Sequence, residues 1–431
     1  MNNKDAQHTP PPRKRRRRRR KINYKRFIPS LIILALLFAA LIFGVYKLSV
    51  FVIMKFAEGN LPQNTPSSIA SSVIEEEPQP TVQTVRFSCS GDDLIHDGLY
   101  MMARKRTSDG TYNFVPLYEN VASYYKNFDV NWINQETLVS DEISPSGYPC
   151  FCSPGNVAHT LYDIGFRVFA MSNNHSYDQG AAGIASTLDF WSKMPDDVTY
   201  FGYYKGAEDY SNITVQEVNG IKIAYLAYTE HTNGLNTPSD AVANVIYTNE
   251  TDVIEQQMQL ARSIADVVIP CVHMGTENSH DINDAQTQLA QQLTDWGADV
   301  IIGTHPHVVQ PIEYFTAADT GKKVPFFYCL GNFVSLQQQA DNLVGIIGSF
   351  NITKTTQPTG ESEVVISDVK AEPIVMYYNS SYTEGQVYLL KDYTDEIAAK
   401  HSNRAVTPAF ARQLINEYID DEFLNDEFKK G

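Results

Sequence analysis

Short apolar runs recur along this chain, and each is followed at once by a cluster of polar side chains. The runs are too short for helices and are rich in β-branched and aromatic residues, so they predict buried strands. Strands are predicted over residues 85–89, 128–133, 166–171, 221–227, 265–272, 300–302 and 324–329. Because these runs are almost continuously apolar, we expect sheets that are covered on both faces.

Amphipathic segments lie between several of these strands. Residues 284–296 place Leu289, Leu293 and Trp296 on one stripe, and Gly297 follows, which is typical of a helix end. Helices are also predicted over 183–191 and 252–264; beyond residue 336 we predict strands 343–353 and 363–376, helices 392–400 and 407–418, and a charged, fraying tail 420–430. Strands that alternate with helices indicate the α/β class.

Residues 1–26 differ from the rest of the chain, since they hold 12 of its 34 lysines and arginines. Residues 27–46 carry no charged side chain, and about 20 apolar residues in a helix cross a hydrocarbon core of roughly 30 Å. We therefore predict a single-pass signal anchor over 27–50 in the cell membrane, with a cytoplasmic basic tail and an extracellular body. A nucleic-acid-binding tail and a cleaved signal peptide are the alternatives. The adjoining apolar span argues against the first and its length against the second.

The segment after the apolar span is expected to be an extended linker, because residues 57–84 are rich in Pro, Ser, Gln and Glu and lack periodicity. Beyond residue 56 the chain holds 20 Lys and Arg against 49 Asp and Glu. Bulk charge therefore does not attract an anionic polymer, and nucleic acid is not an expected partner. An anionic substrate requires a local cation or a metal ion.

The cysteine pattern does not indicate a disulfide-framed domain, because the count of five is odd. Cys89, Cys271 and Cys329 lie in predicted strands, where buried free thiols are expected. Cys150 and Cys152 lie in a loop, where a strained local disulfide is the alternative to free thiols.

The polar clusters at the strand ends carry the candidate chemistry. They contain Asp92, Glu136, Asn174, His175, His273, His305 and His307. Carboxylates that bridge, imidazoles that fix positions and an amide oxygen that adds no charge are what a dinuclear metal site requires. Each residue could instead cap a turn, but such a set at successive strand ends favours a metal site. Pro306 is expected to hold His305 in extended geometry, so that the two loop histidines sit on a stiff segment.

Several of these segments resemble the ordered motifs of a known family. They are Ser90-Gly-Asp-Asp, Asn134-Gln-Glu, the stretch Asn173-Asn-His-Ser-Tyr-Asp-Gln-Gly180, His273-Met-Gly-Thr-Glu277, Gly303-Thr-His-Pro-His-Val-Val-Gln310 and Leu330-Gly-Asn-Phe333. The chain is similar here to the CapA-type capsule-synthesis family, which is associated with poly-γ-glutamate and related to calcineurin-like metallophosphatases. The resemblance implies a four-layer α/β/β/α sandwich over 85–336, with 337–431 completing or supporting it.

The resemblance also implies roles for individual residues. Metal-binding positions are matched by Asp92, Glu136, Asn174, His273, His305 and His307. His175 matches a catalytic histidine, and Asn134, Glu277 and Gln310 match substrate-binding or supporting positions. One or two divalent ions are implied, and the sequence does not distinguish Mn, Fe and Zn. The implied partners are the membrane, an anionic polymer such as poly-γ-glutamate, and membrane subunits of a polymer synthase or exporter.

The sequence departs from the phosphatase pattern at one position. Phosphatases begin with Asp-x-His, whereas Asp92 is followed by Asp93 and Leu94, and His96 lies further on. Three functions therefore stay open: a metal-dependent hydrolase or transferase, a non-catalytic polymer-binding scaffold of an export complex, and a plain metallophosphodiesterase.

Overall fold

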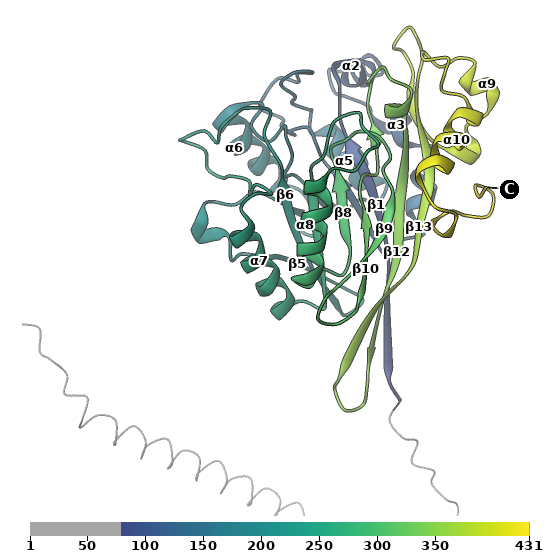
Figure 1. Ribbon diagram of the computed structural model, residues 1–431. Coiled ribbons are helices and arrows are strands. Elements are labelled where there is room, and N and C mark those ends of the chain that lie inside the picture. Colours follow the sequence, from purple (N-terminus) through teal and green to yellow (C-terminus); the bar gives the residue numbers. More distant parts are fainter. Residues whose placement is uncertain (1–78, 431) are drawn as a thin grey trace, which may run out of the picture. The chain divides into compact units, whose positions relative to one another are not determined.

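The computed structural model describes residues 79–430, which contain two β-sheets flanked by helices (Figure 1). The larger sheet has the order β14-β13-β12-β1-β2-β3-β4, with β11 paired to β1, and the smaller has the order β5-β6-β7-β8-β10-β9. The larger sheet comprises β1 (Thr81–Asp93), β2 (Val130–Asn134), β3 (Val168–Ala170), β4 (Thr199–Phe201), β11 (Asn332–Val334), β12 (Val344–Thr356), β13 (Ser362–Tyr378) and β14 (Gly385–Leu389). The smaller comprises β5 (Thr214–Val218), β6 (Ile221–Thr229), β7 (Val267–His273), β8 (Ile301–Thr304), β9 (Ile312–Thr316) and β10 (Lys323–Phe327).

The helices occur between these strands, as the alternating pattern predicts, and the α/β class is confirmed. They are α2 (Asp97–Lys105), α3 (Val115–Tyr118), α4 (Ala122–Tyr125), α5 (Asn156–Asp163), α6 (Gly180–Trp191), α7 (Thr251–Ile264), α8 (Asp284–Asp295), α9 (Asp395–Ala398) and α10 (Pro408–Tyr418). No helix within residues 79–430 combines the length and the apolar character needed to cross a membrane. The predicted anchor over 27–50 and the basic tail 1–26 lie outside the described residues.

The two sheets pack face to face because their strands alternate between two buried surfaces. In β7, Ile269 and Cys271 face the core between the sheets, while Val268 and Val272 face the core under α7 and α8. Phe87 of β1 approaches Tyr225 of β6 across the first core, with 6.4 Å between ring centroids. Burial on both faces explains why these strands read as continuous apolar runs.

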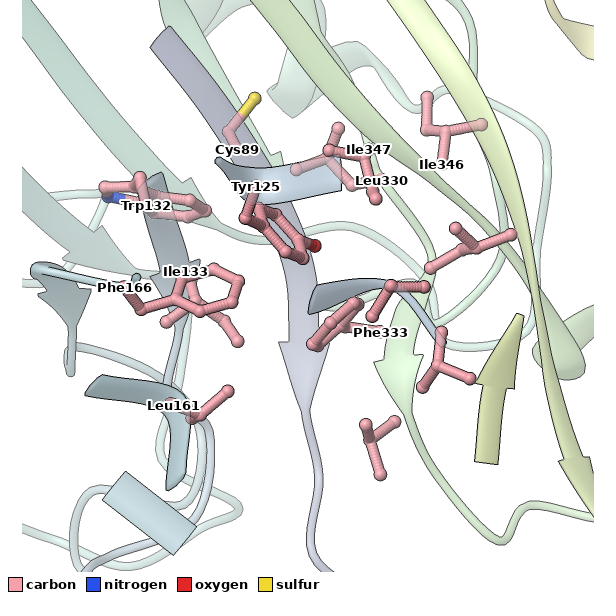
Figure 2. Close-up of a cluster of buried hydrophobic side chains, with 14 of the residues drawn as sticks. Cys89, Tyr125, Trp132, Ile133, Leu161, Phe166, Leu330, Phe333, Ile346 and Ile347 are labelled. Carbon is pink, nitrogen blue, oxygen red and sulfur yellow. The ribbon is translucent and has the colours of Figure 1, made fainter. Parts of the chain in front are cut away.

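The outer face of the larger sheet forms a further apolar layer with its own helices. Figure 2 shows Ile133 and Phe166 beside Leu161 of α5, and Tyr125 of α4 near Phe333. The rings of Tyr125 and Phe166 lie 4.5 Å apart between centroids. Helices, two sheets and helices therefore follow one another in layers.

Several predicted boundaries and states differ from the structure. The linker expected over 57–84 ends earlier, because Thr81–Thr84 already pair with β12. The helix expected over 392–400 is only the short α9. The tail expected to fray is anchored, since Phe423, Leu424 and Phe428 are buried. All five cysteines are free, with Cys150 exposed and the other four buried.

Candidate metal centre

The carboxyl ends of the central strands of both sheets meet, and the polar residues that follow them lie together there. Asp92 is next to the end of β1, Asn134 ends β2 and His273 ends β7. The strand register places Asp92 beside Asn134 on one side and Asn332 of β11 on the other. The Asn134 amide donates to Asp92 Oδ1 at 2.7 Å and lies 3.4 Å from His273 Nδ1. It therefore joins the two sheets at this edge.

Asp92 and His307 form one half of the cluster. His307 Nδ1 lies 3.1 Å from Asp92 Oδ2 and 3.0 Å from Asn332 Oδ1. The backbone N–H of His305 donates to the same Asp92 oxygen at 3.4 Å. Burial alone lowers the pKa of His307, but the carboxylates of Glu136 and Asp92 outweigh it and raise that pKa to about 9. This half therefore attracts positive charge strongly.

His273, Asn174 and His305 form the other half. His273 Nε2 lies 2.9 Å from Asn174 Oδ1 and 3.1 Å from His305 Nδ1. The opposite ring nitrogen, Nδ1, lies 2.9 Å from Thr304 Oγ1, which fixes the orientation of the imidazole. Burial, and after it the neighbouring imidazoles, hold the pKa of His273 and His305 well below the usual histidine range. Neutral imidazoles are the form that binds metal.

Glu136 lies between the two halves, near imidazoles of both but without a hydrogen bond to any described residue. Its Oε1 is 3.7 Å from Nε2 of both His273 and His307, and 3.9 Å from Nε2 of His175. Both carboxylate oxygens are buried without a hydrogen-bond partner among the described residues. Burial, reinforced by the charge of Asp92, raises the pKa of Glu136 well above its usual range.

This donor set fits a divalent cation. Asp92, Glu136 and His307 offer ligand atoms that all lie within 4.8 Å of one another. A buried carboxylate without a partner is costly, and a cation among these oxygens and imidazole nitrogens would compensate it. Because Glu136 lies near imidazoles of both halves, it is placed to contact a cation in either.

His175 is held beside this cluster by a carboxylate. Its Nδ1 lies 2.7 Å from Asp178 Oδ2, which also accepts the backbone N–H of Phe151 at 2.7 Å. The Phe151 ring meets the imidazole edge-on, with 4.7 Å between centroids. With Nδ1–H donating to Asp178, Nε2 is the acceptor and faces Glu136.

The loop that carries His305 and His307 is not extended as predicted. His305 has φ 104° and His307 has φ 60°, both positive, which side chains other than glycine rarely adopt. The expected restriction by Pro306 is therefore wrong. Gly303 lies inside β8, where a Cβ atom would come within 2.1 Å of the Tyr328 carbonyl oxygen. The close approach of Tyr328, which directly follows β10, thus requires glycine at this position.

The profile of the bacterial capsule synthesis protein family PGA_cap matches residues 86–337 of this chain. The chain belongs to this family. The CapA-type family identified from the motifs is thereby confirmed.

Two relatives of this PGA_cap family member are Bacillus proteins. The chain is 32% identical over 209 residues to the PGA biosynthesis protein CapA of Bacillus subtilis (strain 168), covering 48% of this chain and 52% of that protein. It is 33% identical over 184 residues to the capsule biosynthesis protein CapA of Bacillus anthracis, covering 40% and 41%. The matched region thus spans about half the length of the first relative and less of the second.

Solved structures with a similar arrangement include two nucleotidases. The NAD nucleotidase of Haemophilus influenzae gives a TM-score of 0.41 at 14% identity, covering 80% of this chain and 57% of that one. The 5′-nucleotidase of Candida albicans SC5314 gives 0.35 at 12% identity, covering 67% and 52%.

Two of the residues expected at the PGA_cap site lie apart from the cluster. Glu277 is exposed, although its charge influences the pKa of Glu136. Gln310 is buried, and its side chain bonds to Gln286 and to the carbonyls of Ser279 and Asp281 rather than to a candidate ligand. Gln310 therefore stabilises the loop that contains Ser279 and Asp281. The other eight expected residues contact one another as described above.

Sequence reasoning missed residues that orient the candidate ligands. Asn332 contacts His307, Thr304 contacts His273 and Asp178 contacts His175. All three lie inside the motifs quoted for the family, so their positions were visible without their roles. His96 Nδ1 lies within hydrogen-bond distance of the Leu94 carbonyl and the Leu336 backbone N–H, and its pKa is influenced by His307 and His175.

Proposed function

We propose that this protein is a membrane-anchored, extracytoplasmic component of capsule or poly-γ-glutamate biosynthesis or export, and that it acts through a metallophosphatase-like divalent metal centre. Membership of the PGA_cap family and the names of its two bacillar relatives support the pathway. The basic segment 1–26 followed by the apolar segment 27–50 supports the anchor. The body then faces the compartment where the polymer accumulates.

The observation that carries the metal centre is the unpartnered carboxylate of Glu136 among imidazole nitrogens. We propose two cation positions, one on each side of this carboxylate. Asp92 and His307 would hold one, and Asn174, His273 and His305 would hold the other. When bound, divalent ions supply Lewis-acid chemistry and a water of lowered pKa, suited to cleaving or transferring an amide or phosphoryl bond.

The side chains around the centre supply proton handling. Asp178 holds the His175 ring so that Nε2 points toward Glu136. A proton on that nitrogen is available to a leaving group within hydrogen-bond reach. Phe151 packs on the ring and reduces its freedom to rotate away.

One observation favours a second candidate, a scaffold that holds polymer through bound metal without catalysis. The position where phosphatases place their first histidine is occupied by Leu94, which is buried. His96 lies four residues after Asp92, and its Nδ1 contacts backbone atoms. A cation position at Asp92 that lacks an imidazole at residue 94 would have a lower capacity to activate water.

Metal analysis of the purified full-length protein tests the centre. We expect bound divalent metal that is lost in the double variant His305→Ala/His307→Ala and kept in His159→Ala, whose histidine is exposed on α5. Equal metal in all three proteins would refute the site.

The variant His175→Ala separates enzyme from scaffold. An enzyme keeps its metal and loses turnover by about 10²–10⁴-fold, whereas a scaffold exports polymer at the wild-type rate. Hydrolysis of generic aryl phosphodiesters with manganese would instead indicate a plain phosphodiesterase.

A further inference from the structure

A cavity of about 360 Å³ lies at the edge of the larger sheet that also carries the metal centre, but away from that centre. It is lined by residues that end β13, begin β14 and follow α2 and α9. Figure 1 shows α2, α3 and α9 gathered at this end of β13. Strand β12 lies between β1 and β13 and pairs antiparallel with both, so β13 runs in the same direction as β1. Two inter-strand spacings place β1 and β13 roughly 10 Å apart. None of the candidate metal ligands lines this cavity.

The lining of the cavity carries positive charge. Arg106 is half-buried and donates to the carbonyl of Asn113 at 3.1 Å. Within residues 79–430 no carboxylate forms a direct ion pair with it, although the charges of Glu119 and Glu384 favour its charged form against the effect of burial on its pKa. Other partly covered arginines among the described residues are paired, as Arg262 is with Asp299 at 2.6 Å. Lys400 lies exposed at the rim. Positive charge is scarce in a body this acidic, so an unpaired guanidinium lining a cavity indicates an anionic ligand.

The lining also carries negative charge and aromatic rings. Tyr377 donates its hydroxyl to Glu384 Oε2 at 3.2 Å. Tyr388 donates to Gln386 Oε1 at 2.6 Å, and its ring meets that of Tyr377 edge-on, 6.1 Å between centroids. These bonds hold the wall in place before any ligand arrives.

The combination favours a ligand that carries both charges. Glu384 disfavours a second negative charge beside it, and Arg106 and Lys400 disfavour a simple amine. A group that carries one carboxylate and one ammonium on the same carbon atom can interact with both kinds of side chain. The tyrosine faces can pack on its carbon chain and favour the ammonium.

We propose that this cavity binds an amino-acid end group with a free α-ammonium and α-carboxylate, pairing the carboxylate with Arg106 and the ammonium with Glu384. The group belongs either to a free amino acid or to the amino terminus of a γ-linked glutamate chain. The choice of that polymer rests on the proposed function, whereas the end-group chemistry does not.

Calorimetric titration of the purified full-length protein in EDTA tests this inference without the metal centre. The probes are a γ-linked glutamate trimer with a free amino end, the same trimer N-acetylated, and free glutamate. We expect the free-ended trimer to bind and N-acetylation to weaken binding by at least about tenfold, since an ion-paired hydrogen bond is lost. Free glutamate that binds as tightly as the trimer assigns the site to free amino acids, and weaker binding assigns it to chain ends. Both results support the end-group chemistry.

Matched variants connect the binding to the cavity. Arg106→Gln weakens the free-ended trimer by about tenfold or more, whereas Lys105→Gln, an exposed neighbour with the same charge change, leaves it unchanged. Glu384→Gln, at an exposed position that folding tolerates, weakens the free-ended trimer but not the acetylated one. Equal affinity for both trimers, no effect of either cavity variant, or no binding of any probe would overturn the proposal. Because EDTA is present throughout, failure of the metal centre does not affect these outcomes.

Discussion

Replacing Glu136 with glutamine should change the stability of the protein in opposite directions with and without metal. Both carboxylate oxygens are buried and unpartnered in the described part of the chain, and burial raises the pKa of this group. Glutamine has the same shape, carries no charge, and its amide can donate to the imidazole nitrogens that lie 3.7–3.9 Å from Oε1. Removing an unsatisfied buried group of this kind is worth about 1–3 kcal/mol. In EDTA, Glu136→Gln should therefore raise the free energy of unfolding by about that amount.

In the presence of metal the stability difference between Glu136→Gln and the wild type should reverse, because the variant lacks the carboxylate that would bind the cations. A cation at 100 times its Kd stabilises the native state by about 2.7 kcal/mol. The wild type gains this in saturating Mn²⁺, whereas Glu136→Gln gains little, so the variant becomes the less stable protein.

Denaturant unfolding of both proteins in EDTA and in Mn²⁺ measures the effect, with Glu363→Gln, an exposed carboxylate on β13, as the control. A variant that is destabilised in EDTA, or that gains as much from Mn²⁺ as the wild type, would refute the reasoning.

Three further outcomes follow from the structure. Asp178→Asn should leave metal content unchanged and lower any turnover less than His175→Ala does, because it frees the imidazole without removing it; parallel metal analysis and activity assays check this. Gly303→Ala should destabilise the fold by about 1–3 kcal/mol and lower metal content, since its Cβ would meet the carbonyl oxygen of Tyr328 at 2.1 Å; thermal unfolding and metal analysis measure both. Burial raises the pKa of Glu372 to about 7, so ionisation opposes folding increasingly as the pH rises from about 4.5 to 7. Glu372→Gln should therefore stabilise the protein by roughly 2–3 kcal/mol at pH 8 and little at pH 4, whereas the exposed Glu363→Gln on the same strand should show no such pH dependence in denaturant unfolding.

The strands that carry the metal centre could be predicted because both of their faces are buried. In β7 and β8 every position is apolar or small up to the polar residue that ends the strand, so the sequence itself marks where each strand ends. Parallel strands bring those ends to one edge, which is why His273 and His305 could be expected to meet from sequence.

The local sequence pattern did not predict features that depend on contacts between segments far apart in the chain. The short strand β11 pairs in parallel with the end of β1, and only this pairing brings Asn332 to His307. The tail after residue 420 reads as charged and exposed, yet Phe423 and Phe428 are buried by segments far from it in the sequence. Side-chain contacts of this kind carry no periodic signal.

The positive φ angles at His305 and His307 also depend on distant contacts. Such conformations persist only where the surroundings hold them. Here the carbonyl of Pro306 accepts the backbone N–H of Asn278 at 2.8 Å, and the carbonyl of His307 accepts the Asn342 amide at 3.1 Å. The Asn342 amide also donates to Asn278 Oδ1 at 2.8 Å, which links the two restraints.

Asn342 lies beyond the segment that the family profile covers. The C-terminal part of the chain also contacts the loop between β7 and α8, where Tyr418 of α10 stacks on His280 with 4.0 Å between ring centroids. The geometry of the candidate metal ligands is therefore set jointly by the family segment and by the strands and helices that follow it. Removing residues 337–431 would release the loop backbone as well as part of the sheet, so the metal centre belongs to the whole folded body.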